Sequence, residues 1–195
     1  MLPLTQILSL TPNPGFMGLY VIFFYISYYG LASGYTSDSL SFYLIPILNA
    51  TSVFGRIIPN ILADKIGPLN LIAPSALVSS ILTYCVIANR SQGGVIAIAA
   101  LYGFFSGTFV SLPPSIVVRL TPPDKRFQIG TRLGMFFTCA SFGVLIGAPV
   151  AGAILGGNND FTGMFIFGGT TLMAGAILFA LTRMLQAKWK LLARC

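Results

Sequence analysis

The sequence predicts an all-α integral membrane protein with six transmembrane helices. Of its 195 residues, 55% are hydrophobic and only 8% are charged, whereas soluble proteins carry about 25% charged residues. The apolar residues form long runs, and a hydrocarbon layer of about 30 Å needs roughly 20 apolar helical residues per crossing. The sequence lacks the alternation of membrane β-strands, so helices are the expected spanning elements.

Six apolar runs are long enough to cross the membrane. They cover about 15–34, 39–62, 68–89, 94–118, 129–155 and 161–184. Short links rich in turn-forming residues, such as YTSD and NRSQGG, separate them. We predict one transmembrane domain at 15–185 and a basic cytoplasmic tail at 186–195. An irregular segment is expected at 1–14, because its prolines interrupt the approach to the first span.

The fourth and fifth spans contain the residues most able to bend or approach a neighbour. SLPPS at 111–115 and GAPVAGA at 147–153 are predicted bending points, because proline removes a backbone hydrogen bond. GFFSG at 103–107, GVLIG at 143–147 and GAILG at 152–156 place glycines four apart, which lets helix backbones come close. Plain helix packing explains most of these glycines, and helices that slide or rock are the functional alternative.

The positions of Lys and Arg predict the orientation. If the chain starts in the cytoplasm, the links at 31–38, 90–93 and 156–160 face outside, with Arg90 as their only basic residue. The remaining link and tail residues would be cytoplasmic, namely Lys65, Arg119, Lys125, Arg126, Arg132, Arg183, Lys188, Lys190 and Arg194. This asymmetry follows the positive-inside rule, so the net charge of +7 indicates topology and not nucleic-acid binding. We expect a multi-pass protein of the plasma membrane with a cytoplasmic C-terminus.

Catalytic and metal chemistry find no support in the composition. The chain has no His, and Cys85, Cys139 and Cys195 form no pairing or ligand pattern. The spans contain no paired acids or activated nucleophile. We therefore expect neither an enzyme nor a cofactor or metal site.

The second span carries a polar stripe around a charged residue within the membrane. Its members recur at helical spacing and are Asn49, Ser52, Arg56 and Asn60. An Arg within a helix costs about 2.5–3.5 kcal/mol on insertion, so by default it indicates function. Arg56 is predicted to contact a substrate or its pathway, and the alternative is that it extends to the headgroups or forms a structural pair. Pro59 also leaves the carbonyl of Gly55 without its helical donor.

Several stretches resemble a known family. LADKIG at 62–67 resembles the loop signature that joins the eighth and ninth helices of the major facilitator superfamily. FMGLYVIFFYISYYG, ILNATSVFGRIIPNILADKIGPLN and IGTRLGMFFTCASFGVLIGAPVAGAIL resemble its fungal monocarboxylate-transporter-like members. The resemblance covers about 15–184 and implies the C-terminal half of a twelve-helix transporter, built from two inverted three-helix repeats. The chain departs from the family pattern at Asn60, Pro68 and Leu69 of the loop and at Ser52, where animal carriers have an acid.

The resemblance implies a substrate site in the cleft between two halves. Arg56 would hold a carboxylate, with Asn49 as a hydrogen-bonding neighbour. Tyr25 of the first span would add a hydroxyl, and Tyr28 and Tyr29 are either similar donors or interfacial anchors. On the fifth span Thr138 and Ser141 share a face with Gly134, which we expect to line the same cleft.

The loop after the second span is predicted to act as a conformational switch. The resemblance implies that Asp64, Lys65 and Gly67 latch the cytoplasmic side, where Asp64 could meet Arg132 or the positive end of the fifth helix. The alternative is that the loop simply caps the third helix.

Three functions are compatible with the sequence. The leading one is transport of a small solute, favoured to be an organic anion or monocarboxylate, by alternating access. The second is a truncated product without transport of its own, and the third is a six-helix homodimeric channel or scaffold. The expected partners are the bilayer, the solute, and an N-terminal six-helix half or a second copy, with no nucleic acid.

Overall fold

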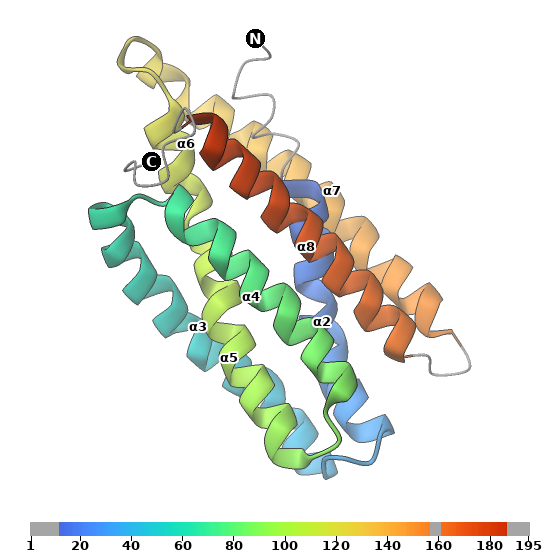
Figure 1. Cartoon of the computed structure of the whole chain (residues 1–195). Coiled ribbons are helices and arrows are strands. Elements are labelled where there is room, and N and C mark those ends of the chain that lie inside the picture. The colour runs from blue at the N-terminus through green and yellow to red at the C-terminus, as the bar shows by residue number, and fades with distance from the viewer. Residues whose placement is uncertain (1–11, 157–160, 187–195) are drawn as a thin grey trace.

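Six long helices form a bundle in the computed structural model, which describes residues 12–156 and 161–186 (Figure 1). They are α2 (Pro12–Ala32), α3 (Asp38–Ile66), α4 (Leu69–Ala88), α5 (Gln92–Ser111), α7 (Ile129–Leu155) and α8 (Phe161–Gln186). A short helix, α6 (Pro113–Leu120), continues α5, and a 3-10 helix, η1 (Pro123–Gln128), leads into α7. With α5 and α6 joined as one span, the described residues contain six spans long and apolar enough to cross a membrane. This confirms the predicted fold class.

Prolines affect the helices differently according to their position. The break between α5 and α6 at Leu112 falls inside the predicted bend SLPPS, because the two prolines that follow have no N–H to donate. By contrast, α7 continues through Pro149 as one helix. Residues 12–14 are helical, so the irregular segment predicted up to residue 14 is wrong there, since proline is well tolerated in a first helical turn. Residues 1–11 and most of the predicted tail lie outside the described part.

Local capping sets several helix ends. Ser37 accepts a hydrogen bond from the N–H of Leu40 at the start of α3, and Ser91 accepts one from Gly94 at the start of α5. Gly67 ends α3 with φ of 98°, a conformation that favours glycine, and donates to the Ala63 carbonyl at 2.8 Å. These signals turn the chain sharply between neighbouring spans.

The six spans form two three-helix units. The first unit is α2, α3 and α4. The second is α5 with α6 as one span, α7 and α8, and the main helix contacts join one unit to the other. The first helix of each unit packs on the second helix of the other, as α2 on α7 and α5 on α3. The two third helices, α4 and α8, pack on each other and lie next to one another in Figure 1. This is the pairing expected of two inverted repeats.

The second helix of each unit is the least covered. Only 28% of the apolar window of α3 and of α7 is buried inside the bundle, against 50% for α2 and for the α5–α6 span. Both α3 and α7 therefore present wide faces on which no other described helix packs.

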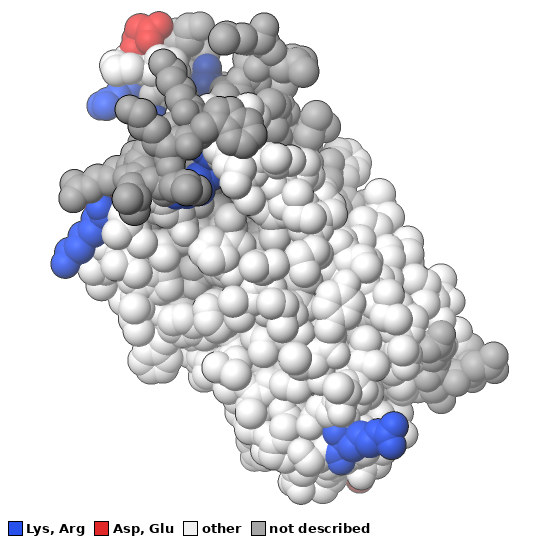
Figure 2. All heavy atoms as spheres, viewed as in Figure 1, with Lys and Arg blue, Asp and Glu red and all other residues white. Residues whose placement is uncertain are grey.

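Basic residues separate toward one end of the bundle, which we call the basic end. It comprises Lys65 in the last turn of α3, Arg119 in α6, Arg126 in η1, Arg132 in the first turn of α7 and Arg183 in α8. Arg90 lies at the opposite end, between α4 and α5, which we call the Arg90 end. Figure 2 shows the charged atoms at the two ends and a neutral surface between them. A neutral surface suits a membrane-spanning bundle, and the exposed Arg56 of α3 departs from it.

Candidate functional site

Arg56 lies near the middle of α3 with an exposed side chain. At about 1.5 Å per residue, it is about 15 Å along the helix from the last residue, Ile66. At about 100° per residue, Asn49 and Asn60 project within about 40° of Arg56. Asn49 is exposed and Asn60 is half-buried. These three residues form what we call the polar flank of α3.

Ser52 does not belong to this flank, contrary to the stripe predicted from spacing. It is buried, and its Oγ donates to the carbonyl of Asn49 at 2.8 Å. Gly107 of α5 lies directly against the Ser52 backbone. The prediction is wrong at this residue because the close approach of α5 decides which edge of the stripe is covered.

The two amides of the polar flank are anchored to their own helix. The Nδ2 of Asn49 donates to the Ile45 carbonyl at 3.1 Å, and that of Asn60 donates to the Arg56 carbonyl at 2.6 Å. A side-chain amide has two N–H donors, so each residue keeps a second N–H that can serve a ligand. Beside a guanidinium with five donors, this flank is rich in groups that suit a carboxylate.

The described acidic residues lie far from the middle of the spans. Asp38 is in the first turn of α3, Asp64 is close to the end of the same helix, and Asp124 is in η1. No described carboxylate therefore shares the depth of Arg56. The two alternatives for Arg56, contact with a solute and extension of its side chain to the headgroups, both stay predictions.

The carbonyl of Gly55, which Pro59 leaves without a helical donor, has a partner on another helix. The Oγ1 of Thr108 in α5 donates to it at 2.8 Å. Glycines allow this approach, because a Cβ on Gly55 would overlap the Phe104 backbone and one on Gly103 would overlap the Leu48 backbone. The orphan carbonyl is visible in the sequence, but its donor lies 53 positions away, and no local signal points to it.

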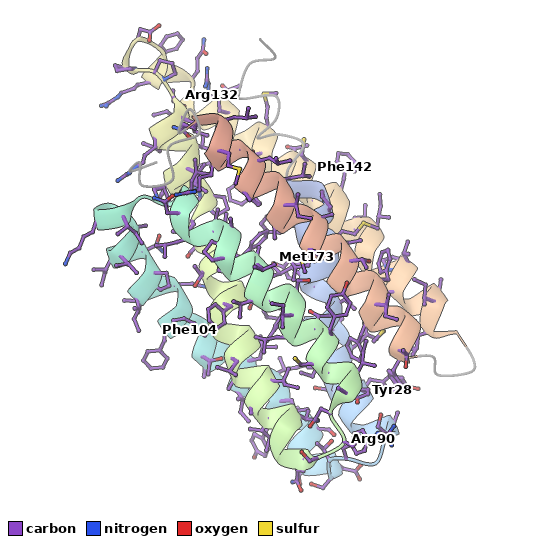
Figure 3. The ribbon with its side chains drawn as sticks, in the orientation of Figure 1. Tyr28, Arg90, Phe104, Arg132, Phe142 and Met173 are labelled. Carbon is purple, nitrogen blue, oxygen red and sulfur yellow. The ribbon has the colours of Figure 1, made fainter. Side chains whose placement is uncertain are left out.

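On α7 the predicted face is uncovered. Gly134, Thr138 and Ser141 are all exposed, and they lie opposite the buried side of the helix, which includes Phe136 and Ala140. The Oγ of Ser141 donates to the Thr138 carbonyl at 2.8 Å. Thr138 is about 14 Å along the helix from Ile129, a depth similar to that of Arg56. In Figure 3, the neighbouring Phe142 lies at the outer edge of α7.

The structure brings Thr138 and Ser141 together, but it does not bring them to Arg56. Among the described helices, α3 and α7 share no extensive contact, and α2 packs on both of them. The two polar surfaces therefore flank the central helix α2 at similar depth. A cleft that used both would need a further element to cover them.

The tyrosines of α2 have separate environments. Tyr25 is half-buried, and its hydroxyl donates to the Ala148 carbonyl of α7 at 3.0 Å. Tyr29 is buried, and its hydroxyl donates to the carbonyls of Val86 and Asn89 at 3.1 and 3.2 Å. Tyr28 is exposed near the Arg90 end (Figure 3). The visible role of Tyr25 is thus to tie α2 to α7, and substrate contact by its ring or oxygen stays a prediction.

The residues predicted as a switch gather at the basic end. Asp64 and Lys65 are exposed in the last turn of α3, and Arg132 is half-buried in the first turn of α7 (Figure 3). Gly67 supplies the turn between α3 and α4. Because α3 and α7 lack extensive contact among the described helices, the structure does not join Asp64 to Arg132. Nor does it support the capping alternative, since α4 begins after Pro68 without a side-chain cap.

A different pair of side chains ties the helices at the basic end. The Nδ2 of Asn70 in α4 donates to the Ile66 carbonyl of α3 at 2.5 Å, and the Nε of Arg183 in α8 donates to the Oδ1 of Asn70. Asn70 thereby bridges the end of α3 to α8. This link was not predicted from the sequence. The one feature that could have indicated it is the amide side chain of Asn70 in the first turn of an apolar span.

Comparison with known proteins places these features in a family. Residues 8–193 match the Major Facilitator Superfamily. The chain is 50% identical over 166 residues to the MFS-type transporter dbaD of Emericella nidulans, which covers 84% of the chain and 37% of that relative. It is also similar to the Aspyridones efflux protein apdF of the same fungus, at 37% over 162 residues (83% and 33% covered). The Agnestins efflux protein AgnL12 of Paecilomyces divaricatus is 32% identical over 169 residues (87% and 38% covered). The chain thus spans only 33–38% of the length of these relatives.

Proposed function

This chain belongs to the major facilitator superfamily, and on that premise we propose that it forms the C-terminal half of a carrier that exports a small organic anion. It is a multi-pass membrane protein, and its relatives are named as transporters or efflux proteins, which supports membrane transport of a solute. We propose three further points beyond that support: the monocarboxylate-transporter-like subtype, the anionic substrate and the outward direction of transport.

The observation that carries the proposal is the polar flank of α3. Arg56 is exposed at mid-span on a flank where no described helix packs, and a guanidinium pairs with a carboxylate through two parallel hydrogen bonds. Asn49 lies beside it, and Thr138 and Ser141 offer hydroxyls at similar depth on α7. Tyr25 on α2, the helix between them, completes the set of proposed substrate contacts.

The transport cycle would proceed by rocking of this unit against a second one. Carriers of this architecture bind substrate between two halves and expose it alternately to each side. The basic end would be cytoplasmic under the positive-inside rule, in the plasma membrane. There Asp64, Lys65, Gly67 and Arg132 would contact the second unit and switch its position.

The second unit is either an N-terminal six-helix half or another copy of this chain. The uncovered faces of α3 and α7 fit both, so a homodimeric assembly is the second candidate. Expression of the chain alone and together with the first six spans of the 50%-identical relative separates them. Export only in the paired sample supports the heteromeric carrier, whereas export by crosslinked homodimers supports the second copy.

Substitution of Arg56 tests the anion site. In membrane vesicles with the active assembly, Arg56→Ala is expected to lower export of radiolabelled monocarboxylates about ten-fold, the loss expected for one charge-assisted hydrogen-bonding group. Arg56→Lys should retain part of the activity. Arg126→Ala is the matched control, because Arg126 is exposed in η1 at the basic end, and it should leave export unchanged. Undiminished export by Arg56→Ala would reject the anion proposal.

A further inference from the structure

A polar pocket of about 270 Å³ lies at the Arg90 end of the bundle. The end of α2, the link after α4 and the start of α8 form it together. The residues that matter for its chemistry are Tyr29, Ser33, Tyr35, Arg90, Phe161 and Thr162. It lies at the opposite end from the proposed switch, and it is separate from the polar flank of α3.

Arg90 lies apart from the other described basic side chains. The other described basic side chains lie at the basic end, apart from Arg56 at mid-span. Among the described residues that line the pocket, Arg90 is the charged one. Arg90 thus brings a positive charge to this pocket, at the end of the bundle where fewer of the described basic side chains lie.

An aromatic cluster lies beneath the backbone that leads to Arg90. The Tyr29 hydroxyl donates to the carbonyls of Val86 and Asn89, so it fixes the backbone directly before Arg90. The Tyr29 ring packs against Tyr35, Phe161 and Phe165, with centroid distances of 6.0, 5.3 and 5.2 Å. Tyr29 and Phe165 are buried and Tyr35 and Phe161 are half-buried, so the cluster forms a packed floor beneath the exposed Arg90.

The remaining polar groups of the pocket are hydrogen-bond donors that suit an anion. Ser33, in the turn after α2, and Thr162, in the first turn of α8, bring hydroxyls into the same lining as Arg90. A guanidinium with nearby hydroxyls can donate to several oxygens of one phosphate. Such a pocket is large enough for a headgroup phosphate and too small for a whole lipid.

The surroundings of the pocket favour a lipid as the source of the anion. The large side chains that α4 and α8 expose are apolar, among them Leu77, Ile81 and Ile166, so these helices face acyl chains. The pocket lies where α4 ends and α8 begins, at headgroup level, and Tyr28 is exposed beside it, as aromatic residues are at membrane interfaces. Figure 3 labels Tyr28 and Arg90 at this end of the bundle.

We propose that this pocket binds the phosphate of a phospholipid in the leaflet at the Arg90 end, with Arg90 as the charged donor and Ser33 and Thr162 as supporting donors. The site does not depend on what the protein transports. Only its assignment to the outer leaflet rests on the orientation proposed above.

Native mass spectrometry of the purified full chain tests the site. The delipidated protein is offered phosphatidylglycerol or a phosphate-free galactolipid with the same acyl chains. The unsubstituted chain should retain phosphatidylglycerol preferentially, and Arg90→Ala should lower that retention about five-fold, the effect of one basic residue at an anionic membrane surface. Arg90→Lys should retain part of the binding, and Arg126→Ala, at the opposite end, should retain all of it.

Several outcomes would overturn the proposal. Equal retention of the galactolipid, or full retention by Arg90→Ala, would show that the phosphate is not recognised here. Displacement of the lipid by millimolar inorganic phosphate or acetate would assign the pocket to a soluble anion. If circular dichroism shows that Arg90→Ala is unfolded, Thr162→Val decides the matter. It removes one neutral donor and should lower retention about three-fold, whereas unchanged retention would reject the site.

Discussion

The interface of α5 with α3 and that of α2 with α7 occupy equivalent places in the two three-helix units, yet the hydrogen bonds that hold them differ. Between α5 and α3, Gly55, Gly103 and Gly107 bring backbones into contact, and Thr108 donates to the Gly55 carbonyl that Pro59 leaves vacant. Between α2 and α7, Gly147 lies against the Met17 backbone, and Tyr25 donates to the Ala148 carbonyl.

The difference lies in which carbonyl is bonded. In α7, Pro149 leaves the carbonyl of Leu145 without its helical donor. The Tyr25 hydroxyl donates to the Ala148 carbonyl instead, so this bond does not replace the missing helical one. The same pairing of helices can therefore be held by a bond that completes a helix or by one that only tethers it. We expect α3 to be tied to α5 more firmly than α7 is tied to α2.

The largest expected effect comes from closing the glycine contact of α3. In Gly55→Ala the new Cβ would overlap the Phe104 backbone, which cannot rotate away, so the free energy of unfolding should fall by about 3 kcal/mol. Gly134→Ala on α7 is the matched control. A Cβ there meets nothing within 4 Å, and the change should stabilise by up to about 1 kcal/mol through helix propensity. Denaturation in detergent micelles, followed by circular dichroism, measures both, and equal effects would show that the close approach is not tight.

A smaller loss of stability is expected when the hydrogen bond from Thr108 to the Gly55 carbonyl is removed. Thr108→Val keeps the shape of the side chain but leaves the Gly55 carbonyl without its donor, which should cost about 1–2 kcal/mol. Thr108→Ser retains the hydroxyl and should recover most of that loss. The same denaturation assay applies. A serine variant as unstable as the valine variant would mean that the methyl group, and not the bond, stabilises the interface.

The smallest loss of stability is expected when the hydrogen bond between α2 and α7 is removed. Tyr25→Phe removes only the hydroxyl that donates to Ala148, and an average interhelical hydrogen bond in a membrane protein is worth about 0.6 kcal/mol. The unfolding free energy should therefore fall less than in Thr108→Val. A loss equal to or greater than that of the valine variant would remove the proposed difference between the two interfaces.

The candidate site was only partly predictable from the sequence. Helical spacing placed Arg56 with Asn49 and Asn60, because an angle of about 100° per residue holds along any straight helix. The same spacing misplaced Ser52, since coverage depends on the neighbouring helix. The tie from Arg183 through Asn70 was missed for the same reason, because its members belong to helices that are distant in the chain.

What the sequence alone determined is the class of the protein and the organisation of its spans. The length of the spans, the position of the basic end and the break at Leu112 each depend on local properties. These are the free energy of placing a side chain in lipid and the missing N–H of proline, and neither requires contact with another helix. The tertiary structure decided which polar groups are already bonded and which face outward. Thr108 meets a carbonyl 53 positions away, and Arg90 gains a pocket only when the ends of α2 and α4 meet the start of α8. Such pairings depend on distances through space, which composition and periodicity along one helix do not encode.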